Sequence, residues 1–534
     1  MNKSILDAAP ITSHTFSMKR WPFLVTLMTI SSLCLGAPSS HGHAHHVVVI
    51  VWDGMRPDFV SEKTTPNLWK LAQSGVTFRR HHPAYPSSTE VNGTVMATGV
   101  YPEHSGLMAN REYRPEVDPL KPVAMELPST MQSEGAHYLS VSTVVQTLHA
   151  AGRQTAVAGT KGVALIQDWS HNGPSAAARA SIVFYDGKTA PESAMASLTG
   201  TLGPWPDTIE FPNLPEDQWT TQALTQVLWR NGLPAYSMLW MSDPDYSQHQ
   251  MAPGSQMALA ALKSVDDRLG TVLLALDTNG LRNDTDVLVI SDHGFSTIQQ
   301  SGNVLAPLSA AGLKVTGTAF DHQPQPGEVM AVNNGGSIMF YVIGHDKEVG
   351  RKLTEIVQKS DYAGVIFSRW KFPGTFDLHT AHIATKDAPD VVMSFHWTDA
   401  PNAYGAPGAL FADGSKKLGK GTHASLSPYD MHNTLIAAGP DFRQGWQDDT
   451  PTGNIDLAPT VLWILGIPRA HPMDGRVLLE AMPGHRLARK VSHTLLQAQN
   501  PDTAWHQYLQ VSNVGATQYF DQGDRGLTPS AAPR

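Results

Sequence analysis

The sequence predicts an α/β fold, with a doubly wound, mostly parallel central sheet, helices on both faces and a small α+β cap insertion. Two observations support this fold class. Continuous apolar runs of strand length, such as residues 46–52 and 286–291, are typical of strands buried on both faces of a parallel sheet. These runs alternate with segments of helical periodicity, and strand, loop, helix, strand is the order expected of a doubly wound sheet.

The elements follow one another in that order along the first half of the chain. The pattern predicts a strand at 46–52, a helix from Pro66 that stops at Gly75, a helix at 143–151, strands at 154–159 and 238–241, a helix at 255–277 and a strand at 286–291. The longest helix rests on apolar residues at positions 258, 262, 265, 269, 272 and 276, with Gly280 as its stop. We expect ligands to bind at the carboxyl ends of the strands.

Composition and periodicity divide the whole chain into five regions. We interpret residues 1–39 as a signal-peptide region, 40–302 as the first part of the α/β core with an insertion at about 185–235, 303–400 as a cap-like subdomain, 401–482 as the second part of the core and 483–534 as a polar C-terminal tail. Within the cap the pattern predicts strands at 337–342 and 391–395 and a helix at 347–358. A strand at 434–439 and a helix at 461–465 belong to the returning core.

The N-terminal segment has the features of a secretory signal. Lys19 and Arg20 precede an apolar run at 21–35, which ends in the small residues of 36–39. The chain is therefore expected to be secreted or periplasmic, and Met18 is an alternative start to Met1. The other interpretation is an uncleaved membrane anchor, although a bilayer span usually needs about 20 apolar residues.

Charge and cysteine content exclude several classes of function. The net charge is −9 and the sequence has no basic stripe, so binding to a nucleic-acid polymer is not expected. A small anionic substrate held by metals remains possible. The single cysteine, Cys34, lies in the N-terminal apolar run, so the mature chain has no disulfide, zinc–thiolate site or cysteine nucleophile.

Five short segments supply the side chains that point to a function. They contain three carboxylates, three imidazoles and one hydroxyl: Asp53, Thr89, Asp245, His249, Asp292, His293 and His423. Three of these segments follow strand-like runs, where a doubly wound sheet places its ligands. This inventory fits two adjacent divalent metals and a nucleophile, and it indicates a metal-dependent hydrolase acting on phosphorus.

Two longer motifs carry a resemblance to a known family. The segment 83–106, PAYPSSTEVNGTVMATGVYPEHSG, contains Thr89, and the segments 456–460 and 473–475 read DLAPT and MDG. These motifs resemble the alkaline phosphatase superfamily and, within it, the type I phosphodiesterase/nucleotide pyrophosphatase family. The resemblance extends over about 45–480 and implies an alkaline-phosphatase-like fold.

The resemblance also implies roles for individual residues. Asp53, Asp292 and His293 would hold one metal with the Thr89 oxygen, and Asp245, His249 and His423 would hold the other. Thr89 would attack a phosphodiester or pyrophosphate in line and form a phospho-threonine, while Asn110 would bind the phosphoryl oxygen. The nitrogen and oxygen ligands favour two Zn²⁺ ions over manganese or magnesium.

The sequence departs from the family pattern near the nucleophile, which leaves the substrate open. Glu90 stands where an aromatic residue is usual, and Gly93 replaces a histidine. Lys161 matches a substrate-binding lysine of threonine-dependent monoesterases, but its usual basic partner is Val163 here. The alternatives to a diesterase are therefore a phosphomonoesterase (alkaline phosphatase) or a phosphonoacetate hydrolase-like enzyme. An inactive secreted binding protein is the alternative of another class.

Overall fold

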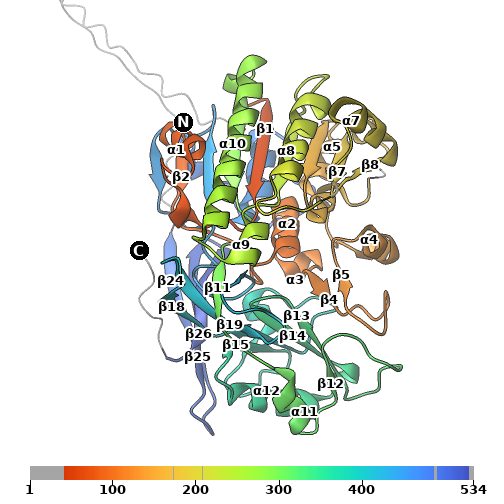
Figure 1. Cartoon of the computed structure of the whole chain (residues 1–534), viewed down its shortest axis with the longest axis vertical. Coiled ribbons are helices and arrows are strands. Elements are labelled where there is room, and N and C mark those ends of the chain that lie inside the picture. The colour runs from red at the N-terminus through yellow and green to blue at the C-terminus, as the bar shows by residue number, and fades with distance from the viewer. Residues whose placement is uncertain (1–40, 172, 207, 486–489, 528–534) are drawn as a thin grey trace, which may run out of the picture. The chain divides into compact units, whose positions relative to one another are not determined.

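A nine-stranded sheet forms the centre of the computed structural model, which describes residues 41–171, 173–206, 208–485 and 490–527 (Figure 1). Its strand order is β22-β2-β21-β10-β1-β9-β6-β7-β8. The five inner strands β10 (Thr285–Ile290), β1 (His46–Trp52), β9 (Tyr236–Met241), β6 (Thr155–Gly159) and β7 (Ile182–Tyr185) are all parallel. The predicted α/β fold with a mostly parallel central sheet is thus confirmed.

The outer strands break the parallel pattern. The strand expected at 434–439 is β21 (Leu435–Ala438), which lies antiparallel between β10 and β2 (Val76–Phe78). The sheet ends with β22 (Trp446–Asp448) on one side and with the antiparallel β8 (Lys188–Ala190) on the other. The region interpreted as an insertion at 185–235 therefore contributes one edge strand to the sheet.

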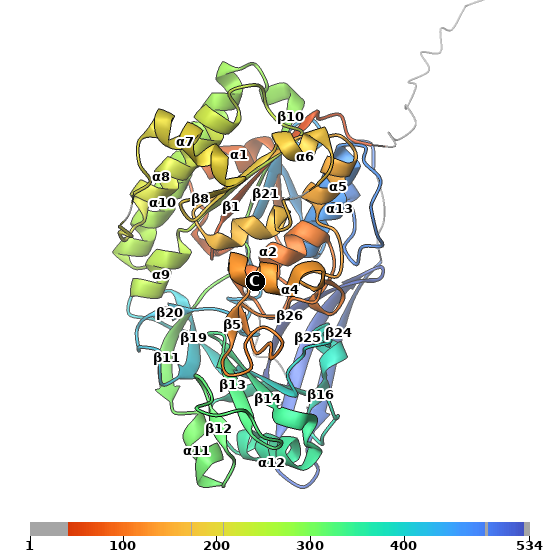
Figure 2. The same ribbon diagram turned by 90° about the vertical axis from the view of Figure 1, so that its right-hand side faces the viewer.

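Helices cover both faces of the sheet, as Figure 2 shows. One face packs against α1 (Pro66–Ser74), α8 (Leu214–Gln222) and α10 (Gln256–Thr278), and the other against α2 (Thr89–Thr98), α5 (Val144–Ala150) and α13 (Leu457–Ile464). Alternate residues of β1 enter the two cores, with Val49 on one side and Ile50 on the other. The Ser255 hydroxyl begins α10 by accepting the Ala258 N–H, and the apolar stripe of this helix faces the sheet.

Shorter elements complete the α/β core. They are β3 (His81–His82), α3 (Pro102–Ser105), β4 (Arg111–Glu112), β5 (Val123–Ala124), α4 (Pro128–Glu134), α6 (Ala176–Ala180), α7 (Met195–Leu202), α9 (Asp245–Met251) and β23 (Thr452–Gly453). Of these, α9 bears the candidate site residues Asp245 and His249.

A second sheet corresponds to the region predicted as a cap. It has six strands, in the order β12 (Val315–Thr316), β13 (Val329–Asn333), β14 (Ser337–Val342), β17 (Val391–Phe395), β15 (Ala363–Ser368) and β16 (Phe376–Asp377). Helices α11 (Leu305–Ala310) and α12 (Lys347–Gln358) pack on it, and Figure 1 shows both beside its strands. The strands and helix expected at 337–342, 391–395 and 347–358 are confirmed as β14, β17 and α12.

A four-stranded sheet lies between the core and the cap. Its order is β18 (Trp397–Pro401), β19 (Pro407–Asp413), β11 (Ser296–Gly302) and β20 (Gly421–Thr422). The turn after β13 touches the core on both sides of the candidate site. Asn334 Oδ1 accepts the Arg111 N–H at 3.0 Å, and the Gly336 N–H donates to the His423 carbonyl oxygen at 2.5 Å. The cap thereby helps to place His423 and the residue beside Asn110.

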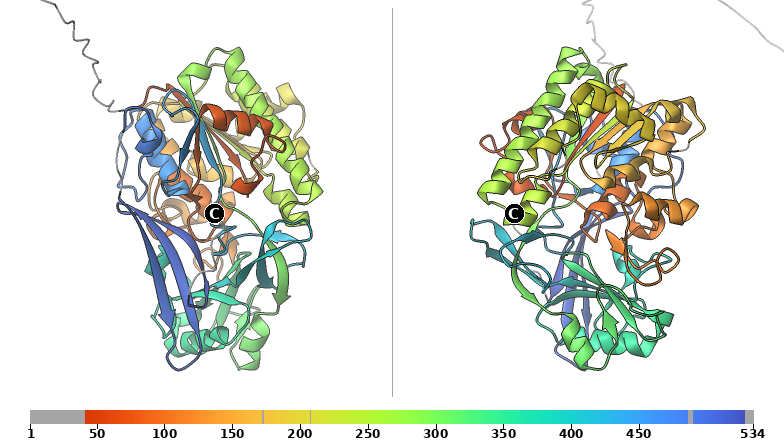
Figure 3. Two further views of the ribbon diagram at one scale, coloured as in Figure 1. Left: turned by 90° about the vertical axis from the view of Figure 1, so that its left-hand side faces the viewer. Right: turned by 45° about the vertical axis from the view of Figure 1, so that its right-hand side comes forward.

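The prediction of a polar tail at 483–534 is wrong for most of that segment. Residues 491–525 form a three-stranded antiparallel sheet, β24 (Val491–Gln499), β25 (His506–Val514) and β26 (Thr517–Arg525) (Figure 3). Apolar side chains on one face, including Leu509, Val511 and Phe520, are buried against the cap. Polar residues are frequent in these strands, and they hide the alternation of apolar and polar residues that indicates a half-buried strand.

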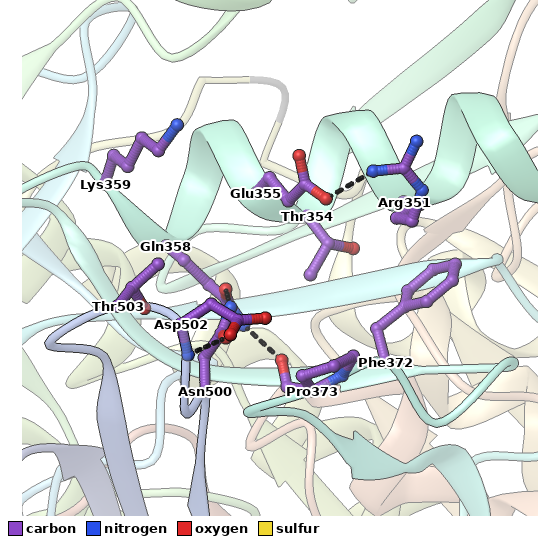
Figure 4. A pocket seen from close by; sticks show the side chains of 10 residues that line it. All are labelled: Arg351, Thr354, Glu355, Gln358, Lys359, Phe372, Pro373, Asn500, Asp502 and Thr503. Atoms are coloured by element: carbon purple, nitrogen blue, oxygen red, sulfur yellow. Dashed lines mark hydrogen bonds and ion pairs between the residues drawn. The ribbon is translucent and has the colours of Figure 1, made fainter.

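Hydrogen bonds at the end of β24 join this sheet to the cap. Asn500 Nδ2 donates to Gln358 Oε1 at 2.8 Å, and Gln358 Nε2 donates to the Pro373 carbonyl oxygen at 2.8 Å (Figure 4). These residues line a hollow of about 380 Å³ between α12 and the turn after β24. The last strands are therefore an integral part of the folded unit.

The predicted signal-peptide region, residues 1–39, lies outside the described residues. Within the described ranges, no helix combines the length and the apolar character that a bilayer crossing requires.

Candidate active site

The register of the central strands brings three candidate carboxylates to one edge of the sheet. Trp52 of β1 pairs with Met241 of β9, and Val51 of β1 pairs with Ile290 of β10. Asp53 follows β1 directly, Asp292 comes two residues after β10, and Asp245 is the first residue of α9 after β9. Parallel strands in register end at the same level, so residues far apart in sequence meet here.

Thr89 is the first residue of α2 and faces this edge. Its Oγ1 lies 3.3 Å from His293 Nε2, which lies 3.2 Å from Asp292 Oδ2. The loop before α2 is held by Asn92, whose side-chain amide accepts the Ala84 N–H at 2.8 Å and donates to the Ser88 carbonyl oxygen at 3.1 Å. The threonine hydroxyl is therefore fixed at a helix N-terminus, where backbone N–H groups favour an anion.

Two groups of side chains present ligand atoms close enough to share a metal ion. Asp245, His249 and His423 form one group, and Asp53, Asp245 and His293 form the other, with the ligand atoms of each group within 4.8 Å of one another. Asp245 Oδ1 lies 3.3 Å from His249 Nε2 and 3.5 Å from His423 Nε2. The rings of His293 and His423 stack at a centroid distance of 3.7 Å, so the two groups adjoin.

The three imidazoles direct the same nitrogen into the site. In each ring Nδ1 donates to a backbone carbonyl oxygen: Gly421 at 3.0 Å for His249, Gly294 at 2.8 Å for His293 and Ser87 at 2.9 Å for His423. A carbonyl can only accept, so Nδ1 bears the proton and the lone pair of a neutral ring is on Nε2. Burial lowers the pKa of His293 and of His423, which favours the neutral form that binds metals.

The carboxylates are buried with unsatisfied oxygens. Within the part of the chain that the structure describes, Asp53 Oδ1, Asp245 Oδ1 and Asp292 Oδ2 have no hydrogen-bond partner. Burial and the neighbouring carboxylate of Asp292 raise the pKa of Asp53 well above its usual range, and burial raises the pKa of Asp292 to about 7. Such oxygens are costly unless a cation or a donor meets them. Together with imidazole nitrogens they fit divalent metal ions such as zinc.

Lys161 reaches into the same cluster. Its Nζ lies 3.0 Å from Asp53 Oδ2 and 3.1 Å from Asp245 Oδ2, and 5.1 Å from the ring centroid of Tyr246. Burial opposes the charge of the ammonium group, but Asp245 and Asp53 outweigh it and raise the pKa of Lys161 well above its usual range. This lysine is part of the site and not a solvent-exposed residue.

Val163 does not face the cluster, although it stands where the resemblance to threonine-dependent monoesterases implies a second basic residue. It is fully buried beneath α2, and a Cβ added at Gly93 would lie 2.5 Å from its Cγ2. Gly93 and Val163 therefore pack against each other, because the small residue on α2 makes room for the valine. A basic side chain at 163 would have to enter the core rather than the site.

Glu90 follows Thr89 and is hydrogen-bonded to Asn110. The Glu90 N–H donates to Asn110 Oδ1 at 3.1 Å, which leaves the amide NH2 as the donor end of Asn110. The Glu90 side chain is buried, and burial together with Glu126 raises its pKa well above the usual range. The uncharged acid is favoured, so Glu90 repels a phosphate less than its residue type suggests.

Sequence reasoning missed two residues that position the carboxylates. Trp240 Nε1 donates to Asp53 Oδ2 at 2.8 Å. Asn454 Nδ2 donates to Asn92 Oδ1 at 3.0 Å and to the Asp292 carbonyl oxygen at 2.6 Å, so it links the start of α2 to the end of β10. The only signal for Asn454 in the sequence is its place two residues before the DLAPT motif at 456–460.

Comparisons with known proteins agree with this architecture. The profile of the family described as "Type I phosphodiesterase / nucleotide pyrophosphatase" matches residues 47–425. The mouse bis(5'-adenosyl)-triphosphatase enpp4 is 22% identical over 445 residues, which cover 82% of this chain and 81% of that protein. Member 3 of the rat ectonucleotide pyrophosphatase/phosphodiesterase family is 25% identical over 260 residues, which cover 47% of this chain and 25% of that protein.

Solved structures with the same fold include murine ectonucleotide pyrophosphatase/phosphodiesterase 5. It superposes with a TM-score of 0.57 at 16% identity and covers 82% of this chain and 100% of its own. A second structure of that protein, an inactive threonine-to-alanine variant in complex with AMP, gives a TM-score of 0.56.

Proposed function

The chain belongs to the type I phosphodiesterase/nucleotide pyrophosphatase family, and from this premise we propose that it hydrolyses phosphodiester or pyrophosphate bonds with Thr89 as the nucleophile. One observation carries the proposal. Thr89 Oγ1, at the N-terminus of α2, lies 3.3 Å from His293 Nε2 at the edge of a buried carboxylate and imidazole cluster. That the murine neighbour with alanine for a threonine is described as inactive supports a threonine nucleophile.

The proposed ligands form two sets around that hydroxyl. Asp53 and Asp292, whose oxygens lie 3.6 Å and 3.2 Å from His293 Nε2, would hold one divalent ion with His293 and the Thr89 oxygen. Asp245, His249 and His423 would hold the other. We propose zinc for both, since the donors are nitrogen and oxygen without thiolate. When bound, such ions neutralise charge on the phosphoryl oxygens and lower the pKa of a hydroxyl group beside them.

The chain's own groups then account for the reaction. Thr89 Oγ1 gives up its proton and forms a bond to phosphorus while the bond from phosphorus to the leaving oxygen breaks, and the electron pair departs with that oxygen. Water next attacks the phospho-threonine from the vacated side and gives up a proton to solvent. The bond from phosphorus to Oγ1 breaks, and Oγ1 takes a proton from solvent to become a hydroxyl again. The Asn110 amide NH2 donates to a phosphoryl oxygen in both steps, and the N–H groups that open α2 favour the same charge.

Lys161 favours a second candidate function, the hydrolysis of phosphomonoesters. A monoester carries one more negative charge than a diester at the phosphoryl group, and Nζ of Lys161 is already inside the cluster, 3.0 Å from Asp53 Oδ2. An ammonium group can meet that charge as a point contact. With Val163 buried, however, the second basic group of a monoesterase is absent from its usual position, so diester or pyrophosphate hydrolysis is the first proposal.

We further propose that the substrate is a small phosphate ester and that the enzyme acts outside the cytoplasm. The basic pair and apolar run of residues 19–35 support export, through a signal peptide or an N-terminal anchor. Fractionation of the producing cells tests this location, and mass spectrometry of the exported protein identifies its first residue.

The decisive test exchanges the nucleophile alone. We expect Thr89→Ala to lower the rate on bis(p-nitrophenyl) phosphate by at least about 1,000-fold, because the covalent route is lost. Thr89→Ser keeps a hydroxyl and is the matched control, with a clearly smaller loss. Metal content of the alanine variant is measured by elemental analysis and should stay close to that of the wild type. Full activity of Thr89→Ala would remove Thr89 from the proposed role.

A further inference from the structure

A long strand forms an open edge of the C-terminal sheet. β24 is nine residues long and pairs with β25 along its whole length, while its other side has no strand partner among the described residues. Figure 3 shows the three strands of this sheet at one side of the molecule. The unpaired N–H and C=O groups of such an edge can pair with a strand of another chain.

Hydrogen bonds at the two ends of β24 show which of its backbone groups face the open side. The Gly515 N–H donates to the Lys490 carbonyl oxygen at 3.4 Å, and the Asn500 N–H donates to the Trp505 carbonyl oxygen at 3.0 Å. Residues 490 and 500 both have even numbers, and the pairing between them has no bulge. Because the two kinds of residue pair alternate in an antiparallel ladder, the odd-numbered residues of β24 direct their N–H and C=O groups to the open side.

The other sheet edges that the structure describes are short, irregular or covered. Three residues form each edge of the central sheet, β22 and β8, and two residues form β12, β16, β20 and each strand of the two-stranded sheets. β18 has a register shift and ends at Pro401. The far edge of the C-terminal sheet, β26, is tied to the rest of the fold. The Gln518 N–H donates to the Tyr101 hydroxyl at 2.9 Å. The Gly523 N–H donates to the Leu426 carbonyl oxygen at 2.9 Å.

β24 lacks the features that usually protect an edge strand from association. Its sequence, VSHTLLQAQ, contains no proline and no lysine, arginine or acidic residue, and its pairing with β25 is regular. Val491 and Leu495 are 38% and 42% exposed on the same face. Gln497 Nε2 donates to the carbonyl oxygen of Leu527, which adds a third exposed apolar side chain nearby. The edge therefore offers both unpaired backbone groups and apolar surface.

The sequence of β24 fits a second copy of the same strand. In an antiparallel pair with a twofold axis at Leu495, this leucine faces its own copy, and the odd-numbered residues of both strands meet. His493 then faces Gln497 of the partner subunit, and Val491 faces Gln499 of the partner subunit. No two carboxylates or ammonium groups are brought face to face, and the open backbone groups of both strands find partners. Such an interface uses the same surface on both subunits and closes as a dimer.

We propose that two copies of the protein associate through β24, in an antiparallel pairing centred on Leu495 that joins the two C-terminal sheets into one continuous sheet. This inference goes beyond the hydrolytic function proposed above and does not depend on it. The candidate active site needs no residue from the second copy, because its ligand groups all come from one chain.

Sedimentation equilibrium measures the association and its dissociation constant. We expect the wild type to sediment with twice the mass of one chain. Leu495→Lys should raise the dissociation constant at least about tenfold, because two ammonium groups would meet at the twofold axis and an apolar pair would be lost. The matched control is Leu274→Lys, at a side chain of α10 that is 65% exposed, and it should leave the constant unchanged. Circular dichroism of both variants checks that each is folded.

Cross-linking tests the register without a destabilising charge. In Leu495→Cys the two introduced thiols lie on residues about 5.5 Å apart between their Cα atoms, so a short bismaleimide should join the subunits. In Gln499→Cys the two thiols lie about 27 Å apart along the strands and should not be joined. Both positions are exposed on the same strand, and both variants also contain Cys34, which therefore cannot cause a difference between them.

Three results would overturn the proposal. The first is a wild type that stays monomeric at micromolar concentration, which would leave the edge to another partner or to solvent. The second is a dimer whose dissociation constant is the same in folded Leu495→Lys and in the wild type, which would place the interface elsewhere. The third is equal cross-linking of Leu495→Cys and Gln499→Cys, which would exclude the pairing centred on Leu495. A dimer that Leu495→Lys weakens and that only Leu495→Cys cross-links supports it.

Discussion

At the residue scale, the buried carboxylate of Asp292 lowers the stability of the metal-free fold and provides an oxygen for a metal ion. Its Oδ1 accepts the Gly54 N–H at 2.9 Å, but its Oδ2 is buried and has no hydrogen-bond partner among the described residues. Asp292→Asn can keep the first contact and removes the buried charge. We expect lower metal content by elemental analysis, and a higher unfolding temperature than the wild type when both are treated with a chelator at pH 8. Two tightly held ions in the variant would contradict the ligand assignment.

The stability of the protein in acid is tied to a buried histidine away from the ligands. Burial lowers the pKa of His81 from 6.5 to about 3. The unfolded chain then binds a proton that the folded chain does not, so the free energy of unfolding falls as the pH drops from about 6.5 towards 3. His81→Gln should lessen that fall, by up to about 1.4 kcal/mol per pH unit, in urea titrations at several pH values. The exposed His45→Gln is the control, and equal slopes in both variants would reject the assignment.

The sequence predicted which residues form the candidate site, but not the hydrogen bonds that position them. Asp53, Asp292 and His293 follow from their places after strands and from the family resemblance. Trp240 and Asn454 could not be predicted, because their hydrogen bonds to the site cross between elements that are distant in sequence. Val163 was expected near the substrate by position alone, and only the packing against Gly93 shows that it lies in the core.

At the element scale, the last strands stabilise the core that carries the site. Tyr519 of β26 is buried; its hydroxyl donates to Asp456 Oδ2 at 2.7 Å and accepts from Arg476 Nε at 3.0 Å. Asp456 immediately precedes α13 and begins the DLAPT motif, so one strand of the C-terminal sheet holds the start of this helix.

Removing that hydroxyl should therefore cost stability. For Tyr519→Phe we expect the free energy of unfolding to fall by roughly 1–3 kcal/mol, because the buried Asp456 carboxylate and Arg476 lose a partner. Denaturant titration measures the change. Tyr404→Phe, at a side chain that is 44% exposed, is the matched control and should be neutral. A neutral Tyr519→Phe would show that the C-terminal sheet does not support the core through this contact.

Elements with a strong periodic pattern were predicted well, and those that depend on partners were not. The segment predicted at 255–277 is α10, whose buried face gives apolar residues at helical spacing. The segment predicted at 46–52 is β1, whose burial on both faces gives a continuous apolar run. The antiparallel insertion of β21 beside β10 has no local signal, because strand order is decided by tertiary pairing. The mostly polar strand β24 falls in the same class.

At the scale of the whole molecule, the unpartnered carboxylate oxygens predict that stability depends on bound metal. Chelation is expected to lower the unfolding temperature and to abolish hydrolysis, because any ion bound only by the folded state adds to its stability. Scanning calorimetry with and without a chelator measures the change, and added zinc should reverse it. If a chelator changed neither the unfolding temperature nor the rate of hydrolysis, the result would argue against a metal centre.

The wide spacing of the site residues has a consequence for how the protein is made. The groups that converge on Thr89 extend from Asp53 to His423, and Asn454 and Tyr519 support them from still later in the chain. A nascent polypeptide that has not yet emerged from the ribosome beyond His423 lacks one imidazole of the cluster. If the proposed ligands hold, we expect such partial chains to be inactive, and hydrolysis to require nearly the whole chain.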